Sequence, residues 1–338
     1  MIRANPKPKI VVIGAGAVGS LIGGLLSRAG EDVTLIARHD HIEAIHANGL
    51  RIEGVLGSLN IPVKAVEALD FQPDLALLAV KTQDVETACR PISTYLANTP
   101  IVTLQNGVRS DEIVASLLPK ENILSGVVMF NAQYLQPGQI TYAHRGSLVI
   151  GKAFGENGQQ VRDIHALLSR AIRTEISDDI QGAHWTKLLG NNLANGLEAM
   201  TGLTIRECMR YPGLRKISVL ALKEGHRAIE KAGFRLAPLP GIPTLGLLLI
   251  VRSPLPVATW TLSFFTGSLK TLSSTLQSLR RGRPTEIDYL NGEIVRLGQQ
   301  VGVATPYNLK VVELVNDVEK SHQFYPPDEL VRHFSFKS

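Results

Sequence analysis

The chain has 338 residues, of which 44% are hydrophobic and 19% are charged, and its formal net charge is +5. This length fits two domains, and the high hydrophobic share with the low charged share fits a compact protein with sizeable cores better than a disordered or solvating chain. Positive residues are scattered apart from Arg280, Arg281 and Arg283. Because no basic surface interleaved with aromatic residues is evident, the sequence gives little support to a nucleic-acid-binding protein.

Neither the cysteines nor the start of the chain indicates export or metal binding. Cys89 and Cys208 cannot build a disulfide framework, and no Cys/His group has the spacing of zinc ligands. Residues 1–9 are polar and lack the apolar run of a signal peptide, and the most membrane-like stretch, residues 245–251, is too short to span a bilayer. We therefore expect a cytoplasmic protein with no metal and no membrane contact.

The first half of the chain alternates between strand and helix patterns. Short β-branched and apolar runs indicate buried strands, and apolar residues three and four apart indicate helices. The expected strands are residues 9–13, 33–37, 74–80, 101–104, 123–130, 139–142, 148–151 and 174–177, and the expected helices are residues 18–29, 85–97 and 159–171. Residues 50–66 alternate and contain glycines, which indicates a small additional β element. The opening strand–loop–helix–strand predicts a parallel pair with a right-handed crossover.

After Asp178 the strand signals nearly vanish. Helices are expected over residues 185–200, 214–232, 262–279 and 286–301, with another after Pro306. Residues 238–256 hold five prolines among apolar residues, which predicts an extended or broken-helix insertion at a surface or interface. Strands with helices first and helices alone afterwards predict two domains, residues 1–178 and 179–338.

A glycine-rich loop joins the first strand to the first helix. It consists of Gly14, Ala15, Gly16, Ala17, Val18 and Gly19. In a strand–loop–helix context the first glycine allows the tight turn, the second lets a pyrophosphate approach the backbone, and the third lets the helix pack on the strand. The helix N-terminus then offers N–H groups to the phosphates. The loop predicts a dinucleotide-binding domain, with a ligand-free glycine turn as the alternative.

The end of the second strand distinguishes between the two nicotinamide cofactors. NAD sites usually carry Asp or Glu there, to bind the ribose 2′-hydroxyl, whereas this chain has Arg38. A guanidinium suits a 2′-phosphate, so NADP is favoured. The alternative is that Arg38 is a solvated residue and that Asp40 binds a ribose.

Two further strands end in polar residues. Lys81 follows the strand at 74–80, and Asn106 follows the strand at 101–104. Because ligands bind at the carboxyl ends of strands in open α/β sheets, we expect both side chains to face the ligand.

A helix with polar residues on one face is predicted in the second domain. Lys187, Asn191 and Asn195 are four residues apart, which places them on one face of a continuous helix. Asparagine is a mediocre helix former, so this face indicates a site, with a solvated surface face as the alternative. In a second segment, Thr285 and Asp288 could form a capping box with Glu286 as a first-turn acid, and this segment alone does not separate capping from catalysis.

In their order, these motifs resemble the 2-dehydropantoate 2-reductase (ketopantoate reductase) family over nearly the whole chain. The matching segments are residues 14–19, Val80-Lys81-Thr82, Gln105-Asn106-Gly107, the Lys187/Asn191/Asn195 helix and Thr285-Glu286-Ile287-Asp288. The resemblance implies an α/β N-terminal Rossmann dinucleotide-binding domain followed by an all-α C-terminal domain like that of 6-phosphogluconate dehydrogenase.

The resemblance also implies residue roles. Lys187 matches the family's proton donor, and Asn106, Asn191 and Asn195 match asparagines that contact the substrate. Ser274 matches a serine that binds the substrate carboxylate. Glu286 matches a carboxylate near the ribose and the substrate hydroxyl, while Arg38 and Lys81 match positions near the NADP 2′-phosphate.

Some positions depart from the family pattern. No asparagine stands near Ile205, where the family has a third substrate asparagine, and residues 233–273 are longer and more apolar than expected. Ser278 stands where an aspartate often follows the glutamine. These departures concern substrate selection more than cofactor use.

The sequence therefore predicts an NADPH-dependent reductase that converts ketopantoate to (R)-pantoate for pantothenate (vitamin B5) biosynthesis, with a homodimer as the expected assembly. One alternative is a related NADP-dependent reductase of another 2-oxo acid. Another is a non-catalytic NADP-sensing protein, which has no need for Lys187 together with Glu286.

Overall fold

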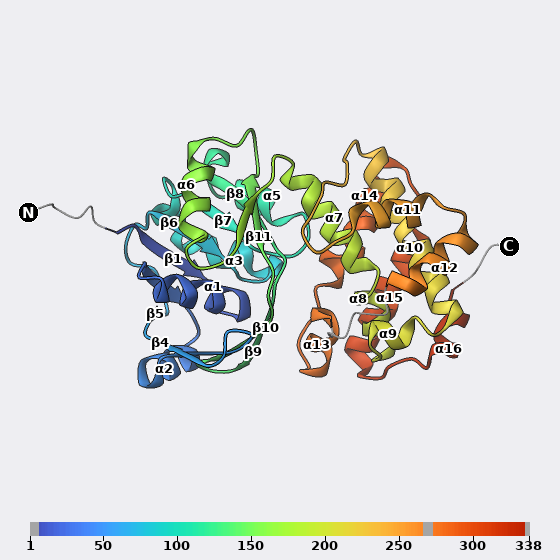
Figure 1. The fold of residues 1–338 in the computed structure, drawn as a ribbon, viewed down its shortest axis with the longest axis horizontal. Helices are drawn as coiled ribbons and strands as arrows, with labels where there is room; N and C mark the ends of the chain where they lie inside the picture. The colour runs from blue at the N-terminus through green and yellow to red at the C-terminus, as the bar shows by residue number, and fades with distance from the viewer. Residues whose placement is uncertain (1–6, 266–272, 335–338) are drawn as a thin grey trace, which may run out of the picture. The chain divides into compact units, whose positions relative to one another are not determined.

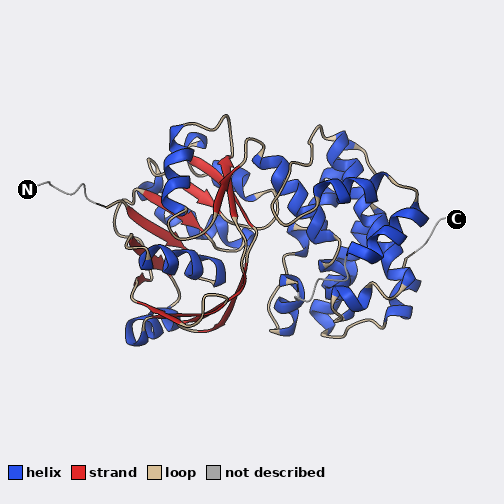
Figure 2. Ribbon diagram, viewed as in Figure 1, coloured by secondary structure: helices blue, strands red, loops and turns tan. Residues whose placement is uncertain are grey.

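The computed structural model describes residues 7–265 and 273–334. The chain divides into two compact units, Met1–Ile180 and Gln181–Ser338. Within the described residues, every named strand belongs to the first unit, and the second unit is built from helices (Figure 2). The expected α/β domain followed by an all-helical domain is confirmed.

The first unit is organised around an eight-stranded sheet with the order β12-β11-β8-β7-β6-β1-β2-β5. Its strands are β1 (Lys9–Ile13), β2 (Asp32–Ile36), β5 (Lys64–Val66), β6 (Leu75–Leu78), β7 (Ile101–Thr103), β8 (Ile123–Val128), β11 (Leu148–Lys152) and β12 (Thr174–Ile176). Neighbouring strands are parallel except for the pair β8 and β11. Strand β2 follows β1 on one side and β6 lies on the other, so the strand order reverses at β1. Open α/β sheets of this Rossmann type bind ligands at such a reversal.

A second sheet accounts for the β element expected over residues 50–66. It has the order β4-β3-β10-β9, with β3 (Leu50–Gly54), β4 (Leu59–Ile61), β9 (Asn131–Gln136) and β10 (Gln139–His144), while β5 returns to the edge of the large sheet. Strand β9 was not predicted, because its sequence NAQYLQ is largely polar and its side chains are half-buried or exposed.

Helix α1 (Ala17–Arg28) lies between the two sheets (Figure 1). A Cβ on Gly23 would lie 2.5 Å from Cδ2 of Leu35 in the large sheet, and a Cβ on Gly24 would lie 2.8 Å from Cδ2 of Leu50 in the small one. Real Cβ atoms do not approach so closely, so glycines on two faces of one helix are what allow it to pack against both sheets.

The remaining helices of the first unit are short. They are α2 (His39–Asn48), α3 (Val85–Cys89), α4 (Ser93–Leu96), α5 (Ser110–Ala115) and α6 (Gln159–Leu168), with 3₁₀ turns η1 (Thr82–Asp84), η2 (Arg90–Ile92) and η3 (Lys120–Asn122). The single helix predicted over residues 85–97 is wrong. Pro91 has no N–H to donate, and the chain forms η2 between α3 and α4.

Helices of the second unit pack around α10 (Pro212–Lys231). The others are α7 (Ile180–Asn192), α8 (Asn195–Thr201), α9 (Ile205–Cys208), α11 (Thr244–Arg252), α12 (Leu255–Phe265), α13 (Ser274–Arg280), η4 (Ile287–Tyr289), α14 (Asn291–Val301), α15 (Pro306–Ser321) and α16 (Pro327–Arg332). The buried carboxylate of Glu224 on α10 accepts hydrogen bonds from the backbone N–H groups of Tyr307 and Asn308, both at 3.0 Å. These bonds cap the start of α15 and tie it to α10.

Two predicted segments of the second unit can be compared with the structure. The proline-rich residues 238–256 contain α11, so they form a broken helix and not an extended insertion; the prolines stand outside α11, with Pro256 in the first turn of α12. The helix predicted over residues 262–279 corresponds to the end of α12 and to α13, and residues 266–272 between them lie outside the described part. None of the described helices has the length and apolar character needed to cross a membrane.

Candidate active site

The glycine loop has the backbone geometry that its three glycines predict. Gly14 has φ of +96°, and a Cβ there would lie 2.7 Å from the backbone nitrogen of Val80. A Cβ on Gly19 would lie 2.2 Å from the carbonyl oxygen of Gly14, so both positions exclude any larger residue. A Cβ on Gly16, in contrast, would have no heavy atom within 4 Å. Gly16 therefore keeps space open without serving the internal packing of the fold.

That open space lies at the N-terminus of α1. Gly16 is the N-cap residue and has no side chain to satisfy the first N–H groups of the helix, which have no acceptor within the helix itself. These groups and the helix dipole favour an anion at this point. The loop therefore fits the pyrophosphate of a dinucleotide, and Gly16 is the residue that lets a phosphate come close.

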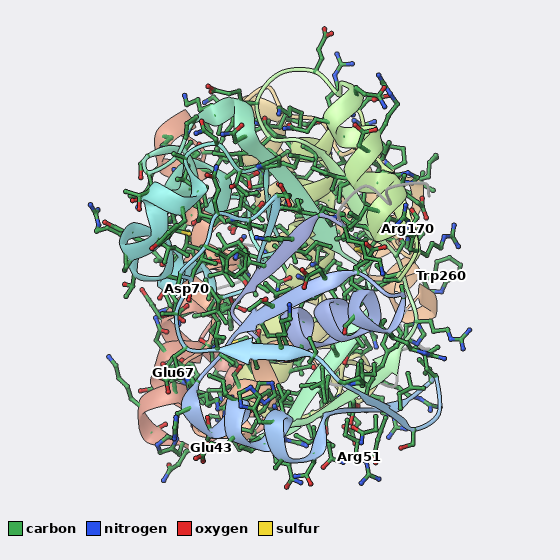
Figure 3. All side chains as sticks on the ribbon, turned by 90° about the vertical axis from the view of Figure 1, so that its left-hand side faces the viewer. Glu43, Arg51, Glu67, Asp70, Arg170 and Trp260 are labelled. Carbon is green, nitrogen blue, oxygen red and sulfur yellow. The ribbon has the colours of Figure 1, made fainter. Side chains whose placement is uncertain are left out.

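Charged residues gather where β2 and β5 end. Arg38 is the N-cap residue of α2 and is exposed. The adjacent His39 pairs with Glu43 at 3.3 Å and with Glu67 at 2.8 Å, and both carboxylates lie on the same edge of the first unit (Figure 3). The hydrogen bond to Glu67 and the charge of Glu43 raise the pKa of His39. His39 thus partners both acids, whereas Arg38 forms no ion pair with any described residue.

Gln105, which follows β7, fixes the end of β7 relative to the end of β6. Its buried side-chain amide donates hydrogen bonds to the carbonyl oxygens of Leu78, at 2.8 Å, and Val80, at 3.1 Å. The Thr82 hydroxyl donates to the carbonyl oxygen of Asn106 at 3.2 Å. Lys81 and Asn106, both half-buried, therefore stand at the carboxyl edge of the sheet, as do residues 14–19 and Arg38.

In the second unit, the three predicted polar residues do not share one helix. Lys187 and Asn191 lie on α7, but α7 ends at Asn192 and Asn195 begins α8, so the prediction of a common helical face is wrong for Asn195. At the break the backbone turns with bonds from Leu193 N to Gly190 O and from Ala194 N to Asn191 O.

A contact from α10 explains where this break falls. The Ser218 hydroxyl donates a hydrogen bond of 2.9 Å to the carbonyl oxygen of Leu193. Because a neighbouring helix satisfies this carbonyl, the chain can leave the helical hydrogen-bond pattern there without losing a bond.

Lys187 has the environment of a group that exchanges protons near neutral pH. Burial lowers the pKa of its ammonium to about 8, and the negative charge of Glu286 acts in the opposite direction. An isolated lysine has a pKa near 10.4, so desolvation outweighs the acidic partner. Lys187 and Glu286 are thus electrostatically coupled, although they are 99 positions apart (286 − 187) in the chain.

Glu286 does not serve as a first-turn acid of α14. The helix predicted from residue 286 begins only at Asn291, after the 3₁₀ turn η4. The Thr285 hydroxyl accepts a bond of 3.4 Å from the Ile287 N–H, but this bond closes a local turn and does not cap α14. The structure therefore weakens the capping interpretation and leaves Glu286 as the acidic partner of Lys187.

Glu198, on α8, is a residue that the sequence analysis did not identify. Its buried carboxylate accepts backbone N–H bonds from Ile205 and from Ser273, both at 2.7 Å, and burial raises its pKa. The bond to Ser273 holds the start of α13, where Ser274 lies, although the side chain of Ser274 is outside the described part. A glutamate amid apolar neighbours in α8 was the only signal in the sequence.

Comparison with known proteins places both halves of the chain in the same family. The model of the ketopantoate reductase PanE/ApbA family matches residues 10–155, and the model of its C-terminal domain matches residues 179–319. The 2-dehydropantoate 2-reductase of Pyrococcus horikoshii is 31% identical over 313 residues, which cover 92% of this chain and 97% of that protein.

Solved structures agree with this result. A PanE/ApbA family ketopantoate reductase from Ralstonia eutropha JMP134 has a TM-score of 0.79 at 31% identity, covering 93% of this chain and 99% of the other. D-mandelate dehydrogenase with NADH and anilino(oxo)acetate has a TM-score of 0.80 at 26% identity, covering 93% and 99%. The structural neighbours thus include both a ketopantoate reductase and a D-mandelate dehydrogenase.

Substitution of alanine for Gly14 and for Gly16 should affect different properties, stability in the first case and dinucleotide binding in the second. Gly14→Ala should lower the free energy of unfolding by about 2 kcal/mol or more, because the new Cβ meets backbone at a positive φ. Gly16→Ala should unfold like the wild type yet weaken dinucleotide binding about tenfold or more, since its methyl group would occupy the space open to a phosphate. Urea unfolding and fluorescence titration measure the two effects, and equal dinucleotide affinity of Gly16→Ala and wild type would contradict the assignment.

Removing the charge of Glu286 should lower the pKa of Lys187 further. In Glu286→Asn or Glu286→Gln, the attraction that favours the ammonium is lost while its burial remains, so we expect the pKa to fall below about 8 by about half a pH unit or more. The pH dependence of competitive acetylation at Lys187 reports this pKa. Asp288→Asn, an exposed acid two positions along, is the matched control, and an equal shift in both variants would refute the specific coupling.

Proposed function

We propose that this chain, which belongs to the ketopantoate reductase family, reduces 2-dehydropantoate (ketopantoate) to (R)-pantoate with NADPH. The observation that carries the proposal is the coupling of Lys187, which is half-buried and has its pKa lowered to about 8, to Glu286. The other unit of the same chain has the glycine loop of a dinucleotide site. In this proposal residues 1–178 form the NADP-binding domain and residues 179–338 the substrate domain.

The chemistry follows from the charges on the chain's own residues. A nicotinamide cofactor supplies the hydride that adds to the ketone carbon of a 2-oxo acid. Negative charge then develops on the former carbonyl oxygen, and the ammonium of Lys187 stabilises that charge and donates the proton. Glu286 keeps a larger fraction of Lys187 protonated than burial alone would allow.

Neutral groups complete the proposed substrate site. The amides of Asn106, Asn191 and Asn195 offer hydrogen bonds to the oxo acid, and Ser274 binds its carboxylate. These amides and the hydroxyl carry no charge, so they orient the substrate without adding a second positive charge to the site. In this proposal Lys187 alone carries the positive charge that is lost when the proton is donated.

Lys187→Ala should abolish the proposed proton donor and leave the cofactor site intact. We expect kcat to fall about 10²- to 10⁴-fold, while the Kd for NADPH changes less than about twofold. The matched control is Lys310→Ala, which removes a half-buried lysine of α15 that pairs with Glu313. Steady-state assays with ketopantoate measure kcat, and a Lys187→Ala enzyme with wild-type turnover would rule out the role.

NADP is the proposed cofactor because Arg38 stands at the end of β2, with the neighbouring acids engaged by His39. In Arg38→Ala, the Kd for NADPH should rise about 10- to 100-fold, since a charge-assisted bond to the 2′-phosphate is lost, and the Kd for NADH should hardly change. Arg51→Ala, which removes an exposed arginine of the same unit, controls for net charge. Equal losses for NADPH and NADH would count against a 2′-phosphate contact.

A related reductase of another 2-oxo acid is the second candidate. Two observations favour it: Ile205 is buried where the family carries a third substrate asparagine, and D-mandelate dehydrogenase is among the similar structures. A panel of ketopantoate, pyruvate and phenylglyoxylate separates the candidates by kcat/KM. A value for ketopantoate no higher than that for pyruvate would overturn the pantoate assignment.

The proposal extends to the setting of the enzyme. We place the reaction in pantothenate biosynthesis in the cytoplasm, with the enzyme acting as a homodimer. The dimer is supported by four exposed apolar side chains on α11 and α12, namely Leu245, Leu249, Val257 and Trp260. Sedimentation equilibrium of the purified protein decides between monomer and dimer.

A further inference from the structure

A buried chain of hydrogen bonds joins the second sheet to the glycine loop. It begins at Gly138, in the turn between β9 and β10, whose N–H donates to Nδ1 of His41 at 2.8 Å. Nε2 of His41 lies 3.1 Å from the Ser20 hydroxyl, and that hydroxyl donates to the carbonyl oxygen of Ala15 at 3.0 Å. His41 and Ser20 are buried, with 2% and 0% of their surfaces exposed.

The partners determine which ring nitrogen of His41 carries the proton. Because the Gly138 N–H points at Nδ1, that nitrogen must be an acceptor, and in the neutral ring the proton is on Nε2. Nε2–H then donates to Ser20, which leaves the Ser20 hydroxyl hydrogen for Ala15. The Tyr134 hydroxyl lies 3.2 Å from the same nitrogen.

A neutral ring is also what its surroundings favour. Burial lowers the pKa of His41, and the nearby carboxylate of Asp40 opposes this only in part. A proton on Nδ1 would face the Gly138 N–H, a backbone donor that cannot accept a hydrogen bond. In this series of hydrogen bonds each donor therefore lies on the side of the second sheet and each acceptor on the side of the loop.

Backbone N–H groups of the loop bond to the end of β2 and to the loop itself. The N–H groups of Gly14 and Ala15 both donate to the carbonyl oxygen of Ile36, at 3.2 and 2.9 Å, and the Gly16 N–H donates to Gly14 O at 2.8 Å. The Ala15 carbonyl is held by Ser20. The loop is thus clamped between the end of β2 and the side chains of α1 and α2, with the first N–H groups of α1 left for an anion.

We propose that His41, acting through Ser20, is a positioning residue that fixes the glycine loop in the conformation that binds the dinucleotide phosphates. This inference rests on the proposed function, because it takes the loop to be the cofactor site. His41 touches neither cofactor nor substrate in this role. Its loss should therefore weaken cofactor binding and leave the chemical step unchanged.

Two variants break the chain at different bonds. Ser20→Ala removes the donor to Ala15, and His41→Asn keeps an acceptor near the position of Nδ1 for Gly138 but removes the link to Ser20. The Kd for NADPH, from fluorescence titration of the full-length protein, should rise about three- to tenfold in each variant, as expected for one lost hydrogen bond. The KM for NADPH should rise in parallel, while kcat at saturating NADPH stays at the wild-type value.

Matched controls come from the same two helices. Ser27 on α1 donates to the Pro62 carbonyl at 2.8 Å, and His46 on α2 lies 3.1 Å from the Ala65 carbonyl. Ser27→Ala and His46→Asn thus remove hydrogen bonds of similar length, in less buried positions away from the loop, and their Kd should match the wild type. Thermal unfolding of all four variants shows whether a change in Kd merely follows a loss of stability.

The outcomes separate this inference from the function on which it rests. Wild-type Kd values for Ser20→Ala and His41→Asn, with Gly16→Ala still weakened, would overturn the role of His41 alone. Equal weakening in the variants and their controls would also overturn it, because the effect would then be general destabilisation. If the wild-type protein bound no NADPH, the proposed function would fail and the inference with it.

Discussion

The contact between α1 and the end of β1 constrains the rest of the first unit. Gly19 lies so close to the Gly14 carbonyl that no Cβ fits, and a Cβ on Gly23 or Gly24 would meet leucine side chains of the two sheets on two faces of the same helix. Close packing on both sides places one helix between two sheets, so its N-terminus is fixed by the interior of the domain. A phosphate site built there depends on backbone position alone, and the only glycine of the loop not required by packing is Gly16.

The cofactor half of the candidate site could be predicted because it depends on local sequence. The glycine spacing, the apolar run of β1 and the strand ends at Arg38, Lys81 and Asn106 all lie within segments whose structure is set by their own residues. The sheet reversal at β1 then brings these strand ends to one edge. The polar strand β9 escaped prediction because its neighbours in the sheet, and not its own pattern, make it a strand.

The second unit was harder to predict because contacts distant in sequence decide its details. The hydroxyl of Ser218 on α10 accounts for the end of α7 near Leu193, and no periodicity within α7 reports that bond. Glu198 and His41 are similar cases: each has a buried polar side chain whose partners come from other elements. Sequence alone gives the type of these residues, while their function depends on what the fold places against them.

The environment of Lys187 has a consequence for its reactivity as an amine. With a pKa of about 8, about a quarter of its side chains are uncharged at pH 7.5, compared with about one in a thousand for an ordinary lysine. The uncharged form is a nucleophile toward aldehydes and activated esters. Lys187 is therefore also open to covalent modification by small electrophiles that reach it, and in the proposed function an oxo acid bound next to it would shield it from them.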